Sequence, residues 1–292
     1  MKKSRRRSGD RSDGRLIRSL PPISKMIPFI MPTRNDAMLY YDEAFEISSA
    51  NSFINKLRNE GSKGIGFLHF IIAAYVRVIS MLPGINRFVA GRRVYAANGI
   101  DIVMMVKPNL SVDSSEVAIK VHFLPTDTIY DVYKKMNDAI ENVRTSDEKN
   151  DTDKLMDSLS KLPRGILRFL LMFIRILDYF GILPGRLLDA SPFHGSMIIT
   201  DLGSLRIRPV FHHIYNFGTL PVFIAFGSKR QAFEINKEGK VESKKYLDMK
   251  FTMDERIADG HYFAQFLQGL RYIFLHPDIL LTPPSKIVED IY

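Results

Sequence analysis

The chain has 292 residues, of which 46% are apolar and 25% are charged, a composition typical of soluble globular proteins. Its formal charge of +9 is concentrated at one end, because residues 1–27 contain nine of the 41 Lys and Arg residues and only two of the 32 acidic ones. The absence of cysteine excludes disulfides, iron–sulfur clusters and a cysteine nucleophile, and it predicts a cytoplasmic, reducing location.

Residues 1–27 are expected to form a flexible basic arm, followed by a single domain over residues 28–292. Since the folded body is nearly neutral, we expect no specific nucleic-acid binding, whereas a weak contact with a membrane surface stays open. The first residues lack the apolar core of a secretory signal. The uncharged run 64–76 is too short to span a membrane, and the longer run 162–184 is interrupted by charges.

Strands are expected where apolar residues alternate or run together between turn residues, and helices where they recur at helical spacing. The expected strands are 37–47, 92–96, 100–106, 117–123, 196–202, 220–226, 232–236 and 241–253. The expected helices are 49–59 (capped by Ser48 or Ser49), 66–82, 126–143, a helical region 154–183 and a last helix that ends at His276. Residues 146–153 are expected to form a loop. This mixture predicts an α+β domain with 66–82 as its central helix.

The charges of the segment 162–183 fall in one narrow stripe of a helix, which leaves a wide apolar face. The stripe contains Lys161, Arg164, Arg168, Arg175 and Asp178. Such a face predicts burial against the rest of the domain or against a neighbouring subunit. Two functional alternatives stay open, a lid over an apolar channel and a helix that lies on a membrane surface.

An unusual carboxylate follows the last expected strand. Apolar and polar residues alternate over 247–253, as in a half-buried strand, and this parity places Glu255 on the buried face. Asp259-Gly260 then ends the strand, and apolar residues at helical spacing follow until Pro277. A carboxylate that points inward directly before a helix N-terminus is a candidate functional group.

The segment Glu255-Arg-Ile-Ala-Asp259-Gly260 is similar to the His-x-x-x-Asp-Gly motif of one acyltransferase superfamily. That superfamily comprises the catalytic domains of the 2-oxo acid dehydrogenase acyltransferases and chloramphenicol acetyltransferase. Further segments resemble it in the same order: Asp42-Glu-Ala-Phe-Glu-Ile47, Leu82-Pro-Gly-Ile-Asn86, Ser196-Met-Ile-Ile-Thr200-Asp-Leu-Gly203, Val210–Asn216 and Pro221–Gly227. The resemblance covers residues 28–290, with one departure: Glu255 replaces the catalytic histidine.

The resemblance implies a chloramphenicol-acetyltransferase-like fold, a mixed β-sheet flanked by helices that assembles as a homotrimer. It also implies an acyltransferase that moves an acyl group between coenzyme A and an unknown acceptor at a subunit interface. In this family a histidine removes the proton from the coenzyme A thiol, and a Ser or Thr hydroxyl stabilises the oxyanion. Thr200 matches that hydroxyl, although an ordinary strand threonine is the alternative. We expect a stand-alone domain, without the lipoyl and subunit-binding domains of the multienzyme complexes.

Glu255 is a weaker base than the histidine that it replaces. A Glu pKa of about 4.3 lies ~4 units below a thiol pKa of about 8.5, which makes proton transfer uphill by roughly 5.7 kcal/mol. Burial raises a carboxyl pKa by up to ~3–5 units, so a desolvated Glu255 closes that gap and a solvated one does not. The alternative is a structural carboxylate paired with Arg256 or Arg34.

Other residues complete the candidate site. His212 or His213 is an alternative base, and at most one of them faces the site, because neighbouring strand residues point in opposite directions. Asp259 before Gly260 is interpreted as the N-cap of the last helix and not as a catalytic group. No metal is expected, since the histidines lack the spacing of a metal motif. A catalytically inactive trimer that acts as a binding or scaffold module is the alternative function.

Overall fold

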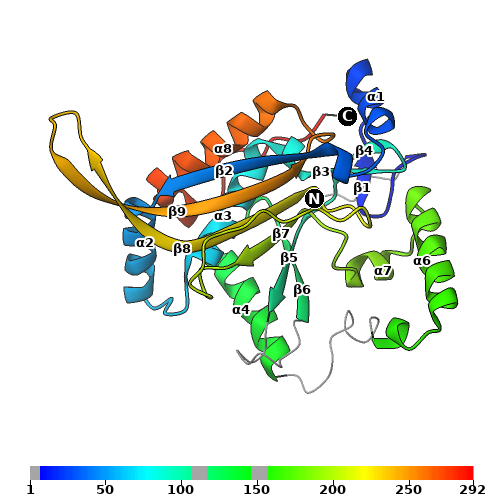
Figure 1. Ribbon diagram of the computed structural model, residues 1–292, viewed down its shortest axis with the longest axis horizontal. Helices are drawn as coiled ribbons and strands as arrows, with labels where there is room; N and C mark the ends of the chain where they lie inside the picture. The colour runs from blue at the N-terminus through cyan, green and yellow to red at the C-terminus, as the bar shows by residue number, and fades with distance from the viewer. Residues whose placement is uncertain (1–6, 107–116, 146–156, 292) are drawn as a thin grey trace.

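The structure is a computed structural model that describes residues 7–106, 117–145 and 157–291 (Figure 1). Its helices are α1 (Pro22–Ile30), α2 (Ser48–Asn59), α3 (Phe67–Met81), α4 (Ile129–Thr145), α6 (Arg164–Tyr179), α7 (Gly185–Ala190) and α8 (Gly260–Leu275). Its strands are β1 (Gly14–Leu16), β2 (Met38–Glu46), β3 (Arg87–Ala90), β4 (Arg93–Ala97), β5 (Ile100–Val106), β6 (Val117–Phe123), β7 (Met197–Asp201), β8 (Val222–Ile235) and β9 (Val241–Asp254). Short 3₁₀ helices occur at Asn35–Ala37, Pro83–Asn86 and Pro277–Leu281. The loop predicted over 146–153 lies outside the described residues.

A mixed sheet with the strand order β2-β9-β8-β7-β5-β6 forms the centre of the domain. β7 runs parallel to both β5 and β8, whereas the other neighbouring strands pair antiparallel. The long strands β8 and β9 continue past the body of the domain as a projecting hairpin, at the left of Figure 1. The predicted α+β class, with a mixed sheet flanked by helices, is confirmed.

α3 is the central helix of the core, as the sequence predicts. Its residues Phe70–Val76 are all buried, which a helix that is apolar on every side requires. α8 packs beside it through Phe263, Phe266 and Leu270. Together with α2 and α4, these helices cover the face of the sheet that carries Met249, Phe251 and Met253. The sheet's buried face is therefore the one that the alternation in β9 predicts.

Residues 7–27 differ from the flexible arm that the charge pattern predicts. β1 pairs antiparallel with β4 in a small second sheet of order β1-β4-β3. Ile17 and Leu20 belong to the main apolar core, and the Arg11 side chain is buried. The apolar residues between the cations hold this segment against the domain, and a count of charges does not reveal them.

Three further predictions change in the structure. The two strands predicted over 220–226 and 232–236 are one strand, β8, which continues through a register shift between Phe226 and Lys229. The predicted serine cap of α2 is wrong, since the helix starts at Ser48 without a side-chain cap. α6 has no buried residue, so the first of its two predicted packing modes, burial of its apolar face against its own domain, does not occur.

Candidate active site

Glu255 occupies the first position after β9. Its main-chain N–H donates to the Ala37 carbonyl at 2.8 Å, and its side chain is exposed. The prediction from strand parity that the Glu255 side chain points inward is therefore wrong for the single chain. Burial no longer alternates at this end of the strand, because the four residues Phe251–Asp254 are all buried. The chain then turns at once, with the Ile257 N–H bonded to the Asp254 carbonyl at 3.2 Å.

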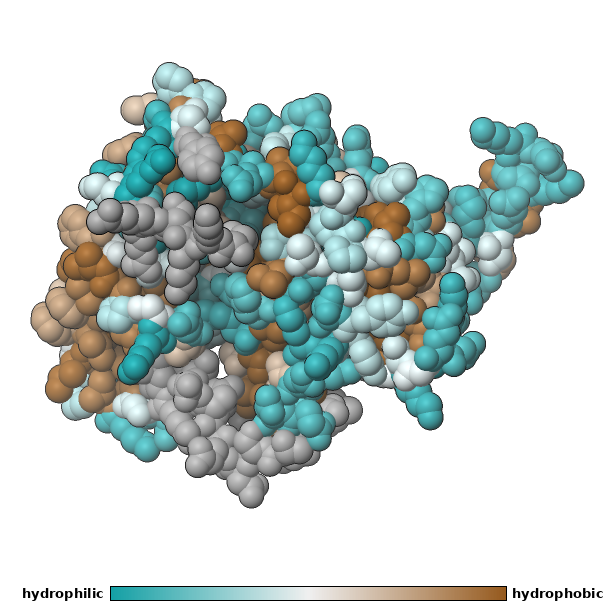
Figure 2. All heavy atoms as spheres, turned by 180° about the vertical axis from the view of Figure 1, so that it is seen from behind, coloured by the Kyte–Doolittle hydropathy of each residue, from teal (hydrophilic) through white to brown (hydrophobic). Residues whose placement is uncertain are grey.

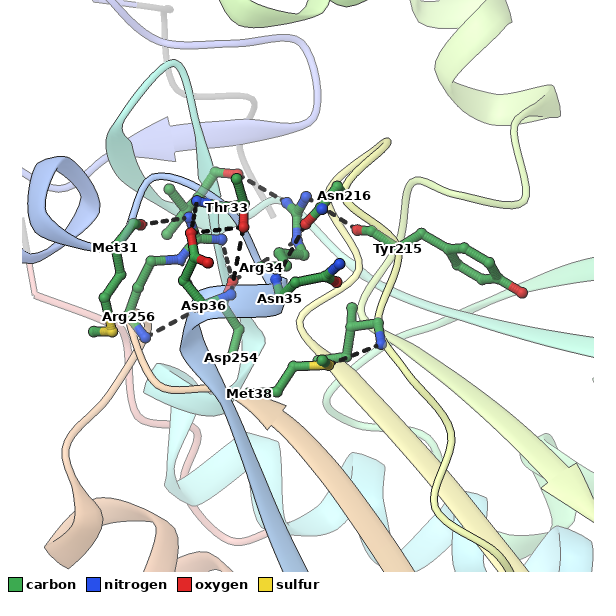
Figure 3. Close-up of polar contacts among 12 residues, drawn as sticks. Met31, Thr33, Arg34, Asn35, Asp36, Met38, Tyr215, Asn216, Asp254 and Arg256 are labelled. Carbon is green, nitrogen blue, oxygen red and sulfur yellow. Dashed lines mark hydrogen bonds and ion pairs between the residues drawn. The ribbon is translucent and has the colours of Figure 1, made fainter.

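Asp254 is the carboxylate that points inward at this strand end (Figure 3). It is 0% exposed and lies between two buried guanidinium groups. Arg256 donates from Nε to Oδ1 at 2.8 Å and from Nη2 to Oδ2 at 2.7 Å, and Arg34 Nε lies 3.7 Å from Oδ2. A buried carboxylate is stable only when it is paired in this way.

The same arginines join the strand end to segments far away in the sequence. Arg34 donates to the Val89 carbonyl at 2.9 Å, and Arg256 donates to the Met31 carbonyl at 3.2 Å. The pairing of Glu255 with Arg256 or Arg34, one of the two alternatives from the sequence, does not occur within one chain, because both arginines pair with Asp254. Glu255 stays accessible as a result.

Burial sets the electrostatics of the cluster. It lowers the pKa of Arg34 to about 10, and the adjacent Asp254 carboxylate opposes that decrease. Burial, and after it the charge of Glu255, raises the pKa of Tyr41. The Glu255 carboxylate therefore lies near a phenol that stays protonated at neutral pH.

Asp259 and Gly260 form the start of α8. The Asp259 carboxylate accepts a hydrogen bond from the Tyr262 N–H at 2.8 Å, which confirms the predicted N-cap. The Tyr262 hydroxyl in turn accepts from the Gly84 N–H at 2.8 Å, in the 3₁₀ helix after α3. A Cβ at Gly84 would lie 2.7 Å from the Tyr262 ring, so this contact requires glycine.

Thr200 is half-buried near the end of β7. Its neighbour Ile199 belongs to the core on the helix side, whereas Ile198 packs with Phe223 on the opposite face. Because side chains alternate along a strand, Thr200 shares the face of Ile198, away from α3 and α8.

His212 lies over that same face. Its ring stacks on Phe223 with centroids 4.4 Å apart, and its carbonyl accepts from the Thr252 hydroxyl at 2.6 Å. Burial, and then the charge of His213, lowers the His212 pKa. His213 is exposed, so the two rings face different surroundings, as expected.

Thr200 and Glu255 are too far apart within one chain to act on the same group. Thr200 is in register with Ala225 of β8, which is in register with Lys250 of β9. Glu255 lies five residues beyond Lys250 in the sequence. At ~3.3 Å per residue and ~4.8 Å per strand, the two positions are separated by roughly 17 Å along the sheet and roughly 10 Å across it.

Two residues of this region, Asp254 and Tyr262, are not predicted from the sequence. Continued alternation places Asp254 on the exposed side of the strand, and the arginine two positions later is the one signal in the sequence for its pairing. Tyr262, which joins α8 to the turn after α3, has no signal in the local pattern.

No protein-family model matches this sequence, and no curated protein matches it either. Solved structures match over most of the chain. A probable dihydrolipoamide acetyltransferase from Listeria monocytogenes matches with a TM-score of 0.57 and 13% identity, over 88% of this chain and 93% of the other. Azotobacter vinelandii dihydrolipoamide acetyltransferase gives 0.57 and 13%, over 90% and 93% of the two chains. A chloramphenicol acetyltransferase gives 0.51 and 12%, over 86% and 94%.

These likenesses confirm the predicted fold. The chain has the fold of chloramphenicol acetyltransferase and of the dihydrolipoamide acetyltransferase catalytic cores. At 12–13% identity they establish the fold alone.

Proposed function

We propose that this protein transfers an acyl group between coenzyme A and an acceptor, in a site that two copies of the chain form together. Glu255 of one copy and Thr200 of the next face the same substrate. The observation that carries the proposal is the accessible Glu255 carboxylate, placed where the resemblance puts the catalytic base and held by the Asp254 cluster. The acyltransferase fold of the similar structures supports it.

The proposed reaction needs no covalent enzyme intermediate. Glu255 removes the proton from the coenzyme A thiol, and the thiolate sulfur attacks the acyl carbonyl carbon. The carbonyl oxygen becomes an oxyanion that accepts a hydrogen bond from the Thr200 hydroxyl. When the tetrahedral intermediate collapses, the bond to the acceptor atom breaks, and that atom takes the proton from Glu255. Transfer from acyl-coenzyme A to the acceptor is the reverse sequence.

A second copy also solves the energetic problem of a carboxylate base. Glu255 is exposed in a single chain, and a solvated carboxylate lies ~4 pKa units below a thiol. A neighbouring subunit that covers Glu255 desolvates it, and desolvation raises a carboxyl pKa by up to ~3–5 units. Assembly therefore activates the base in this proposal.

A ring of identical copies gives every subunit the same two roles. Each interface in a closed ring joins two different surfaces of the chain, so Glu255 lies on one surface and Thr200 on the other. We propose the homotrimer as this ring, and the cytoplasm, which suits a cysteine-free chain, as its location.

His212 is the competing base. It shares the sheet face of Thr200, and its Nε2 atom is buried without a hydrogen-bond partner among the described residues. A neutral histidine whose pKa is lowered by burial is available to accept a proton at neutral pH. Separate substitutions distinguish the two candidates.

Thiol release from acyl-coenzyme A tests the proposal. Because the chain has no cysteine, a thiol reagent reports only the coenzyme A that is released. The wild type, Glu255→Gln, Thr200→Val and His212→Gln are compared over donors of different chain length, each in the presence of a panel of alcohol and amine acceptors. Glu60→Gln, which changes an exposed glutamate at the end of α2, is the matched control.

We expect Glu255→Gln and Thr200→Val each to lower the rate by ~100-fold or more, the usual contribution of an acid–base group or an oxyanion donor. Glu60→Gln should match the wild type. A loss in His212→Gln without a loss in Glu255→Gln would transfer the role of base to His212. No release by the wild type with any donor would contradict the enzyme and favour the inactive binding module.

A further inference from the structure

α6 presents an apolar surface to solvent over its whole length. Within the described part of the chain, this helix stands at the edge of the molecule and contains no buried residue (Figure 1). Among the residues of α6, Phe169 is the most exposed apolar one, with 64% of its surface accessible to solvent. The other exposed apolar residues of this surface are Ile166, Met172, Phe173, Ile176 and Phe180. At 100° per residue these positions share one side of the helix, and Figure 2 shows this edge of the molecule as strongly apolar.

The helix is nevertheless fixed in place. At its C-terminal end, Asp178 accepts a hydrogen bond from the buried Arg11 at 2.6 Å and lies 3.5 Å from His194 Nε2. The Tyr179 carbonyl packs so closely on the β3–β4 turn that a Cβ at Gly91 would lie 2.3 Å from it. The apolar surface is thus held outward by buried polar contacts.

Cations border this surface. Arg164, Arg168 and Arg175 are exposed and lie on one edge of the apolar side. The sequence from Pro163 to Leu177 contains no acidic residue. Long arginine side chains beside an apolar face reach outward to anionic groups while their stems stay on the apolar surface.

A second exposed apolar helix lies at the same end of the molecule. α1 exposes Ile23, Met26, Phe29 and Ile30, and Figure 1 places it near the C-terminal end of α6. Between α1 and the small sheet is a groove of about 320 Å³ with an apolar floor. The charged side chains that line the groove are all cations: Arg18, which also pairs with Asp10, and Lys25, Arg92 and Arg93.

We propose that this end of the molecule binds the surface of an anionic lipid bilayer, with α6 lying in the interface. With 16 residues, α6 is only ~24 Å long, and Arg164 and Arg168 lie in its first two turns. Among the described residues, no helix has the length and hydropathy to cross a bilayer. An amphipathic helix of this kind instead places its apolar side at the level of the acyl chains and its cations at the phosphates.

Charge and extent favour a bilayer over other occupants. The occupant must be apolar along the whole of α6, continue toward α1, and carry negative charge beside Arg164 and Arg168. A bilayer interface offers all three continuously. A second copy of the chain or an acyl chain under a lid would each cover the apolar side, and both are outcomes of the test.

A single tryptophan reports the contact directly, because the chain contains none. Phe173→Trp places the probe on the apolar side of α6, and Phe233→Trp places it on the β8–β9 hairpin, where Phe233 is 71% exposed. With vesicles that contain phosphatidylglycerol, we expect a blue shift and higher intensity for Phe173→Trp and no change for Phe233→Trp. Vesicles of phosphatidylcholine alone should give a much weaker response.

The affinity of charge variants for the same vesicles is measured by flotation. Phe169→Glu should weaken binding by at least about tenfold, because it puts a charge on the apolar side. Arg164→Gln with Arg168→Gln should weaken it by on the order of thirtyfold, since each arginine near an anionic surface contributes about fivefold. Phe233→Glu is the matched control and should bind as the wild type does.

Three results would overturn the proposal. The first is no blue shift of Phe173→Trp with anionic vesicles. The second is a lipid-free Phe169→Glu protein whose assembly mass differs from that of the wild type, which would assign the surface to a second copy. The third is a Phe169→Glu protein that floats with vesicles as the wild type does but releases thiol more slowly from long-chain donors only. That result would make α6 a lid.

Discussion

Asp254→Asn tests the structural basis of the candidate site. The substitution keeps the shape of the side chain and removes its charge, which leaves the guanidinium groups of Arg34 and Arg256 buried without a counter-charge. Breaking a buried ion pair from one side costs about 3–5 kcal/mol. Since a domain is stable by only about 5–15 kcal/mol, this is a large fraction of the total.

Urea unfolding followed by far-ultraviolet circular dichroism measures the effect. We expect the midpoint of Asp254→Asn to fall by roughly 1–2 M, because the urea dependence of the free energy grows with chain length and for 292 residues lies near the upper end of about 1–3 kcal/mol per M. The matched control is Asp248→Asn, which breaks the more exposed pair between Asp248 and Arg230 (2.9 Å). That pair contributes at most about 1 kcal/mol.

If the unfolding free energy of Asp254→Asn stays within about 1 kcal/mol of the wild type, Asp254 is not the required counter-charge of the two arginines. That result would mean that the two arginines reach solvent or other acceptors when the carboxylate is lost. A fall as large for Asp248→Asn would show a general sensitivity of β9 and not a property of the buried cluster.

The remaining predictions concern Asp178 and Asp259. Burial acts to raise the pKa of Asp178, but His194, whose Nε2 lies 3.5 Å away, and the hydrogen-bonded Arg11 outweigh burial and lower the pKa to about 2. Because the pKa in the folded state is below that in the unfolded state, the stabilisation by Asp178 is present above about pH 4 and is lost as pH falls. The difference in unfolding free energy between the wild type and Asp178→Asn should therefore shrink by roughly 2 kcal/mol from about pH 5 to about pH 2. A difference that stays constant with pH would contradict the pairing. Asp259→Ala removes the cap on the Tyr262 N–H and should cost about 1 kcal/mol in urea unfolding, whereas no change would show that water replaces the cap.

Local patterns in the sequence predict much of the fold. The central helix follows from an unbroken apolar run over 70–76, and β9 follows from strict alternation over 247–253. The cap at Asp259 follows from Asp-Gly before an apolar helical pattern. Each of these signals lies within a few residues of the feature that it predicts.

The features that the sequence did not predict depend on contacts between distant segments. Alternation cannot show where a strand ends, so it predicts that Glu255 lies on the buried face. In the structure Asp254 is the buried carboxylate, and Arg34, which lies 220 positions before Asp254 in the chain, helps to hold it in the interior. The docking of residues 7–27 depends in the same way on β4 and on the main core. The separation of Thr200 from Glu255 follows from the register of three strands, which no local pattern contains.

In the proposed site, Glu255 and Thr200 act from different copies of the chain. Mixed assemblies of Glu255→Gln and Thr200→Val subunits test this arrangement. The two variants are expressed together with different affinity tags, and assemblies that carry both tags are purified. Their mass is measured, and thiol release is compared with that of each variant alone.

In a trimeric ring, every mixed assembly contains one interface at which an intact Glu255 meets an intact Thr200. Mixed assemblies should therefore reach about one third of the wild-type rate, although the two variants are nearly inactive alone. Mixed assemblies of confirmed mass that remain as inactive as the separate variants would contradict the shared site.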